Sequence, residues 1–197
     1  MVILPGEKII DKPSRMKSTF VENGKTYASV VGIYSETSKK FVPLKSIYLP
    51  SPGDGVIGVI TEERMHGYVV DIFSPYKGLI LSKFLRTSFS PLDKVYAEVR
   101  EVSEVKDIIL SRPRKLEEGR IIFVHPSKIP RLIGKESSMI NLIRNLTKCE
   151  ITVGTNGAVW LKGKEIKKAI DAIFKVEKEA HIPGLTDRIK GFLESGE

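Results

Sequence analysis

Cysteine is nearly absent from this chain of 197 residues, which contains only Cys149. A single cysteine can form no disulfide within the chain and no zinc site built from several cysteines. Histidine is also scarce: the three that occur, His66, His125 and His181, stand too far apart to show the spacing of a metal site. We therefore expect no disulfide framework, no metal and no cofactor.

Long apolar runs are missing as well. No stretch of the sequence approaches the roughly 20 apolar residues that a membrane-spanning helix needs. The first eight residues, MVILPGEK, lack the basic region and the long apolar core of a secretory signal. We therefore expect a soluble, cytoplasmic protein with no membrane partner.

The sequence also lacks the residue patterns of common catalytic sites. No Ser/His/Asp or Cys/His set and no phosphate-cradling glycine loop can be assembled from it. Asp54 and Asp71 are better interpreted as turn and strand-end residues than as a catalytic pair. We expect a binding protein rather than a catalyst.

Positive charge is what the chain has in excess. It carries 32 Lys and Arg against 24 Asp and Glu, a net charge of +8. The excess is uneven, since residues 53–112 are slightly acidic and both flanking parts are basic. Between residues 119 and 148 six basic residues accompany a single acid, Glu136. Such a local excess favours a polyanion such as a phosphate backbone.

Two clusters of turn residues, at 49–55 and 111–119, divide the chain into blocks. We expect a β-rich N-terminal domain over residues 1–50 and a second domain over 53–112. A third domain follows over 117–180, and residues 181–197 form a tail with a short helix at 185–193. In the first domain we expect a strand at 19–21, a long strand at 26–34 and a short one at 41–44.

The second block predicts five strands, at residues 56–61, 67–72, 78–81, 94–100 and 107–111. Five strands in about 60 residues are typical of a small closed barrel of the OB type. The third block predicts the order β-α-loop-α-β-β-α, with a loop at Gly134 and a tight turn at Asn156. Apolar residues repeat at helical spacing from Met139 and from Ile166, which indicates core packing, and Trp160 is expected in the core or at a domain interface.

These patterns resemble known RNA-binding modules. The segments GD at 53–54, VIG at 56–58, HG at 66–67, GL at 78–79 and ILS at 109–111 resemble an S1 RNA-binding domain with an OB fold. Ile133-Gly134 and the GTNG turn at 154–157 resemble a type I KH domain. The segments YLPSPGD, DIFSPYKG and PSKIPRLIGKESSMI extend this resemblance. Nearly the whole chain is similar to the archaeal exosome RNA-binding cap subunits of the S1/KH type.

The resemblance implies a multidomain β and α+β protein: a β-rich N-terminal domain, a five-stranded S1 barrel and a KH domain. It implies a non-catalytic subunit, three copies of which cap a hexameric ring of RNase PH-like exosome subunits. That subunit recruits single-stranded RNA 3′ ends for processing and degradation. Because a small β-rich block must bury its apolar face against something, we expect the N-terminal block to supply most of the docking surface. The expected apolar contributors are Val2, Ile3, Leu4, Phe41 and Leu44, some of which must also fill the block's own core.

The resemblance also implies which residues contact RNA. In the KH domain they are Lys128, Arg131, Gly134, Lys135 and Ser137. In the S1 barrel the candidates are His66, Tyr68, Phe73, Tyr76, Lys83 and Arg86, and the alternative for Tyr68 and Phe73 is packing in the barrel or against the N-terminal block. The usual KH loop has glycine at both ends, whereas here Ser137 stands at the second position. A serine side chain and the neighbouring Glu136 both hinder close approach of the loop backbone to phosphate.

Two other functions stay open at this point. A free-standing translation or transcription factor could use the same two modules, or the chain could be a nuclease in its own right. The β-rich N-terminal block favours a docking subunit, because a free RNA-binding module does not need it.

Overall fold

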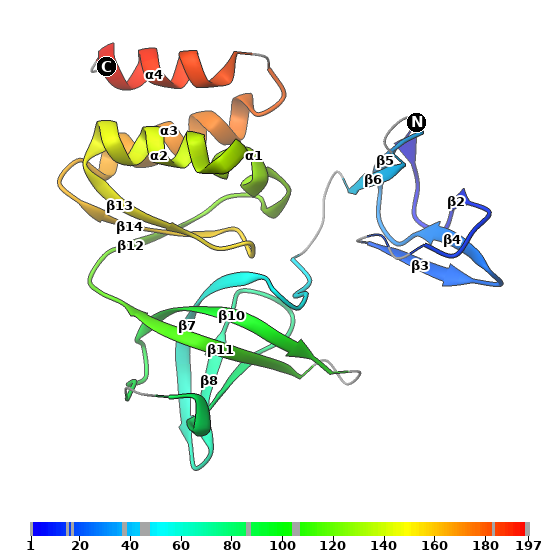
Figure 1. Cartoon of the computed structure of the whole chain (residues 1–197), viewed down its shortest axis with the longest axis horizontal. Helices are drawn as coiled ribbons and strands as arrows, with labels where there is room; N and C mark the ends of the chain where they lie inside the picture. Colours follow the sequence, from blue (N-terminus) through cyan, green and yellow to red (C-terminus); the bar gives the residue numbers. More distant parts are fainter. Residues whose placement is uncertain are drawn as a thin grey trace. The chain divides into compact units, whose positions relative to one another are not determined.

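The computed structural model describes residues 2–14, 16, 18–36, 39–43, 48–85, 88–103, 107–182 and 184–195. Two compact units make up the chain, Met1–Ile47 and Tyr48–Glu197. The second unit contains a barrel followed by a three-stranded sheet with helices (Figure 1).

The N-terminal unit contains two small antiparallel sheets. One has the order β1 (Val2–Ile3), β5 (Gly32–Ser35), β6 (Lys40–Pro43), and the other β2 (Lys8–Ile10), β4 (Lys25–Ala28), β3 (Thr19–Glu22). The single long strand expected at 26–34 is wrong: β4 and β5 lie in different sheets. Of the five apolar residues expected to contribute to docking or to the block's own core, Ile3 and Phe41 are buried in that core. Leu44 lies outside the described residues.

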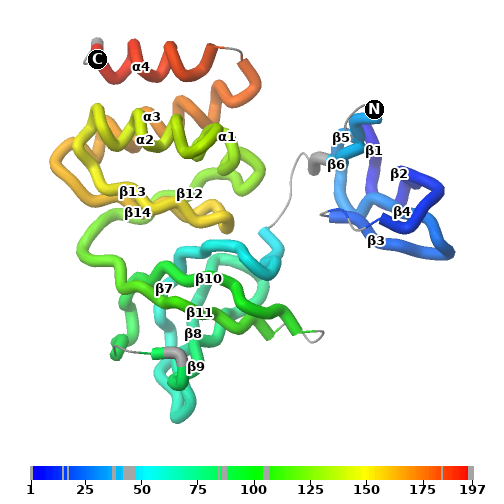
Figure 2. Tube along the Cα trace, viewed as in Figure 1, coloured from blue at the N-terminus to red at the C-terminus, as the bar shows by residue number. Residues whose placement is uncertain are grey.

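The barrel begins the second unit. Its strands are β7 (Gly55–Arg64), β8 (Gly67–Asp71), β9 (Gly78–Leu81), β10 (Lys94–Val102) and β11 (Ile108–Leu116). They close into a barrel in the order β10-β11-β9-β8-β7, and Figure 2 labels all five strands along the Cα trace. The five-stranded barrel is thus confirmed. Gly67 is required at the β7–β8 turn, because a Cβ there would lie 1.9 Å from the Ile80 carbonyl oxygen.

The prediction of a turn at residues 111–119 is wrong for the first part of this segment. Strand β11 continues through it as far as Leu116. Pro113 is tolerated because the β10–β11 register shifts here: Ser111 pairs with Glu98, and Arg114 pairs with Tyr96. Two residues of β11 therefore stand opposite one residue of β10, and a bulge of this kind is a place where a strand accepts proline.

The KH domain follows with the expected element order. It comprises β12 (Arg120–Phe123), α1 (Ile129–Ile133), α2 (Ser138–Thr147), β13 (Cys149–Val153), β14 (Ala158–Gly163) and α3 (Ile166–Glu179). The antiparallel sheet has the order β12-β14-β13, and the helices cover one of its faces (Figure 1). The apolar side chains of α2 and α3 fill the core, as their spacing predicted.

The terminal helix is present as α4 (Leu185–Ser195). Its buried side chains Leu185, Ile189 and Leu193 belong to the same apolar cluster as α2 and α3, so the segment completes the KH core. Among the described residues no helix has the length and apolar character to cross a membrane. Within the same ranges no group of three His, Cys, Asp or Glu side chains is placed to hold a metal ion.

Candidate nucleic-acid interface

The loop between α1 and α2 has an unusual backbone. Gly134 ends α1 with φ 75°, and a Cβ there would lie 2.8 Å from the Met139 amide nitrogen, so this position requires glycine. Glu136 and Ser137 follow with φ values of 51° and 63°. Ser137 therefore takes the left-handed conformation that glycine adopts easily and other residues do not. At the position where the usual KH loop has its second glycine, Ser137 thus takes a backbone conformation that glycine would adopt with less strain.

Three basic residues surround this loop. Arg131 lies on α1 and Lys135 on the loop itself, and both are exposed. Lys128 precedes α1 and is half-buried, and Ser137, at the start of α2, makes no side-chain capping hydrogen bond. The first amides of α2 thus open onto a surface with positive side chains beside it. Helix amides and basic side chains together are suited to bind phosphate oxygens.

On the barrel, the structure brings His66 and Lys83 into one region. His66 lies on the exposed β7–β8 turn, and its carbonyl oxygen accepts a hydrogen bond of 2.9 Å from the Ser82 amide. Lys83, the next residue, is exposed on the short helical turn Ser82–Phe84. The exposed basic side chain of Lys83 and the ring of His66 are therefore carried by the same end of the barrel.

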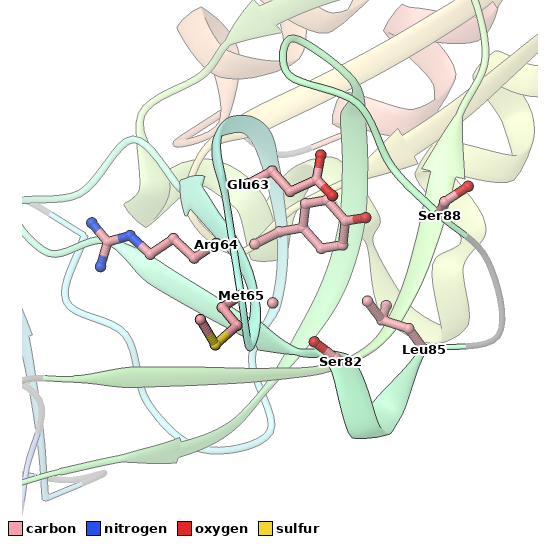
Figure 3. A pocket seen from close by; sticks show the side chains of 8 residues that line it. Glu63, Arg64, Met65, Ser82, Leu85 and Ser88 are labelled. Atoms are coloured by element: carbon pink, nitrogen blue, oxygen red, sulfur yellow. The ribbon is translucent and has the colours of Figure 1, made fainter.

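A hollow of about 340 Å³ opens at this end of the barrel (Figure 3). The β7–β8 hairpin contributes Glu63, Arg64 and Met65 to its wall, and the segment after β9 contributes Ser82, Leu85 and Ser88. Tyr68 also borders it, but this side chain is only 9% exposed and packs edge-to-face on Phe89 at 5.7 Å. The structure therefore places Tyr68 in the barrel core and leaves little of its ring for a base to stack on.

The other aromatic residues on the sequence-based list also pack within the protein. Phe73 meets Phe123 of the KH domain edge-to-face, with ring centroids 4.8 Å apart. Tyr76 is half-buried against the barrel core. Arg86 lies outside the described residues. Stacking of RNA bases on Phe73 or Tyr76 would have to use the part of the ring that this packing leaves exposed.

The GTNG turn joins the KH domain to the barrel. Asn156 is 4% exposed, and its side-chain amide donates to the carbonyl oxygens of Ile57 and Ile72 at 2.7 and 2.8 Å. Its side-chain oxygen accepts from the Ile57 amide at 3.3 Å. Thr155 donates from its amide and its hydroxyl to the Gly55 carbonyl oxygen, at 2.7 and 2.9 Å. These hydrogen bonds therefore attach the turn between β13 and β14 to the barrel.

Tyr48, in the segment that precedes the first barrel strand, also belongs to this junction. Its hydroxyl donates to the Asp54 carboxylate at 2.8 Å. Burial raises the pKa of the Tyr48 hydroxyl well above its usual value, so the group stays protonated and remains a donor. Trp160 packs with Ile57 and Leu116 in an apolar cluster shared by barrel and KH domain, which confirms the interface position expected for it.

Sequence reasoning missed the role of Asn156. The dipeptide Asn156-Gly157 is a turn signal, and that signal accounts for the backbone without using the side chain. The signal that could have predicted this role is an Asn within an otherwise apolar stretch. Such an Asn is expected to be buried, and a buried side-chain amide needs several hydrogen-bond partners.

Comparison with known proteins adds three findings. A model of the KH domain matches residues 119–167. The chain is 37% identical over 212 residues to the exosome complex component Rrp4 of Methanothermus fervidus, which covers 98% of this chain and 94% of that protein. It is 40% identical over 209 residues to the Rrp4 component of Methanobrevibacter smithii, with 98% and 70% covered.

A solved structure is also similar to this chain. A crystal structure with a provisional assignment as an exosome complex RNA-binding protein superposes with a TM-score of 0.68 at 28% identity. The match covers 76% of this chain and 97% of that one.

Proposed function

The chain belongs to the Rrp4 family of exosome complex components, and from this membership we propose that it is a non-catalytic subunit that binds RNA for a partner nuclease. In this proposal three copies cap a hexameric ring of RNase PH-like subunits. Each copy recruits single-stranded RNA 3′ ends and delivers them to the ring for degradation.

The observation that carries the proposal is the positively charged loop at the start of α2. Its residues Gly134, Glu136 and Ser137 have positive φ angles, and Arg131 and Lys135 are exposed beside them. None of the ion pairs found among the described residues involves either side chain. A surface that keeps its cations without carboxylate partners supports binding of an anionic chain rather than a purely structural role.

RNA titrations over a range of salt concentrations test the electrostatic part. If about three to four phosphates are neutralised, the slope of log K against log salt should be about −2 to −3 for single-stranded RNA. The paired change Arg131→Glu and Lys135→Glu should weaken binding strongly and flatten the slope. An affinity that is independent of salt would refute the electrostatic account.

A charge-matched variant serves as control. Lys164→Glu with Lys167→Glu changes the net charge equally, but of these exposed residues Lys164 lies just before α3 and Lys167 in its first turn. If both paired variants lose the same affinity, only net charge matters and the KH loop is not the contact site. Exposed substitutions of this kind usually change stability by about 0.5 kcal/mol or less, so all variants should stay folded.

The second candidate is a free-standing RNA-binding factor in translation or transcription. The mass of the native complex separates the two, because a cap subunit elutes with larger partner subunits and a free factor does not.

A further inference from the structure

The sequence contains two Asn-Gly pairs, Asn23-Gly24 and Asn156-Gly157. In this dipeptide asparagine loses its side-chain amide group readily, because glycine has no side chain to keep its main-chain nitrogen away from the neighbouring carboxamide. The two pairs have the same local chemistry in the unfolded chain. Any difference between them in the folded protein therefore comes from their structural setting.

The pair Asn23-Gly24 lies in an open turn. It joins β3 to β4, and both of its residues are exposed. Their φ values are 49° and 74°. A Cβ added to Gly24 would meet no atom within 4 Å beyond its neighbours in the chain. Water therefore reaches this pair in the folded protein.

The pair at Asn156 is enclosed instead. The buried carboxamide is held by three hydrogen bonds to the backbone of Ile57 and Ile72, and the Gly157 nitrogen donates to the Gly154 carbonyl oxygen at 3.1 Å. Deamidation requires this nitrogen to reach Asn156 Cγ. The carboxamide must therefore leave the barrel backbone before it can react.

The turn between β13 and β14 also requires its glycine. Gly157 has a φ of 88°, and a Cβ on it would lie 2.4 Å from the Val124 carbonyl oxygen. A larger residue after Asn156 would slow deamidation, but this position excludes one. The reactive dipeptide is thus fixed by the turn, and the groups that restrain its carboxamide belong to the barrel.

We propose that Asn156 is a deamidation site that the closed junction of barrel and KH domain protects, and that its conversion makes an opening of this junction permanent. In the open junction the Gly157 nitrogen forms a bond to Asn156 Cγ and loses its proton. The bond from Cγ to Nδ2 breaks, and Nδ2 leaves as ammonia. One water molecule then breaks either C–N bond of the cyclic imide, which gives aspartate or isoaspartate.

The product of this reaction cannot restore the junction. A carboxylate oxygen replaces the nitrogen that donated to the carbonyl oxygens of Ile57 and Ile72, so acceptors face acceptors. A buried charge without a partner is strongly unfavourable. Isoaspartate in addition lengthens the main chain of the tight turn. The inference concerns the junction alone and does not depend on RNA binding.

The first test follows both asparagines of the full chain in mildly alkaline buffer, with and without guanidinium chloride. Peptide mapping by mass spectrometry measures each deamidation rate. We expect similar rates at the two sites in denaturant. Folding should slow Asn156 by about 100-fold or more, because a buried group reacts only through rare openings, whereas Asn23 should change far less.

A weakened junction tests where the protection originates. Leu116 packs in the apolar cluster that barrel and KH domain share, so Leu116→Ala should open the junction more often. We expect this variant, under folding conditions, to deamidate Asn156 about 10-fold faster than the parent does. The rate at Asn23, which lies in the other compact unit, should stay the same.

The matched variants Asn156→Asp and Asn23→Asp test the consequence, because both introduce the product of deamidation. Limited proteolysis should cleave Asn156→Asp faster than the parent between barrel and KH domain, and Asn23→Asp like the parent. Equal slowing of both asparagines on folding would refute the protection by the barrel. An unchanged Asn156 rate in Leu116→Ala would show that global unfolding controls the reaction. Equal cleavage of Asn156→Asp and the parent would show that the product leaves the junction closed. Each of these results overturns the inference.

Discussion

At the scale of single residues, Ser137 holds the most informative backbone conformation. Its φ of 63° and that of Glu136, 51°, place two successive non-glycine residues in the left-handed region. Left-handed residues with a Cβ cost about 1 kcal/mol or more, and such strain persists where the surrounding structure requires it. The loop between α1 and α2 therefore keeps its shape at an energetic cost.

Replacing Ser137 by glycine should relieve this cost. Part of the gain is offset because glycine is more flexible in the unfolded chain, so we expect the free energy of unfolding to rise by about 0.5 kcal/mol. The neighbouring Ser138 has ordinary helical angles, φ −59° and ψ −44°. Ser138→Gly should therefore lower the free energy of unfolding by up to about 1 kcal/mol.

Urea unfolding of the two single variants measures both effects. Opposite signs at adjacent serines support the described backbone, whereas destabilisation by both substitutions would show that Ser137 is not held in the left-handed region. RNA binding by Ser137→Gly should be at least as tight as that of the parent, because the loop backbone loses a side chain that obstructs close approach.

At the scale of elements, the β13–β14 turn fixes the KH domain to the barrel. Asn156→Ala would leave the carbonyl oxygens of Ile57 and Ile72 without their side-chain donor. A buried polar group that loses its partner costs about 1–3 kcal/mol, so we expect a loss of about 2–4 kcal/mol in the free energy of unfolding. Thr155→Val removes the hydroxyl but keeps the hydrogen bond from the Thr155 amide to the Gly55 carbonyl oxygen. It should therefore lower the free energy of unfolding by less than Asn156→Ala does.

Limited proteolysis reports whether the junction itself opens. We expect Asn156→Ala to be cleaved faster between barrel and KH domain, near residues 117–119, while Thr155→Val resists like the parent. Equal stability and equal cleavage of Asn156→Ala and the parent would mean that the turn does not hold the two domains together.

The elements that sequence reasoning found are those with a strong local pattern. Alternation along β10 and helical spacing in α2 both reflect one buried face, and that face is visible in the sequence. The errors have a tertiary cause. Residues 29–31 are rich in β-branched side chains but bend the chain between two sheets, and Pro113 sits in a bulge that only the pairing with β10 creates. For the site, single residues such as Arg131 were visible, whereas the contacts of Asn156 join residues far apart in the sequence.

At the scale of the whole molecule, the N-terminal unit exposes an apolar surface. Val2 and Ile33 are direct cross-strand partners in β1 and β5, and they are 59% and 42% exposed. Leu4, close to Val2 in sequence, is 53% exposed. Exposed apolar clusters of this kind often mark protein interfaces. If this unit docks on a partner subunit, we expect the contact to use Val2, Leu4 and Ile33 rather than the buried Ile3 and Phe41.

Charged substitutions on this surface should break assembly without unfolding the unit. Val2→Asp combined with Ile33→Asp is expected to abolish co-elution with the nuclease ring in size-exclusion chromatography and to leave RNA binding unchanged. The pair Phe20→Asp and Val21→Asp on β3, also exposed, serves as control and should still co-elute. If the first variant co-elutes in full, docking lies in the barrel or KH domain.

The most direct test of the central claim is the rate at which the nuclease ring degrades a long single-stranded RNA, measured without this chain, with it, and with the chain alone. The account predicts no degradation by the chain alone and faster degradation by the ring when the chain is added. It also predicts that this gain is lost with the Arg131→Glu and Lys135→Glu variant. Degradation by the chain alone, or a ring whose rate does not change when the chain is bound, would contradict it.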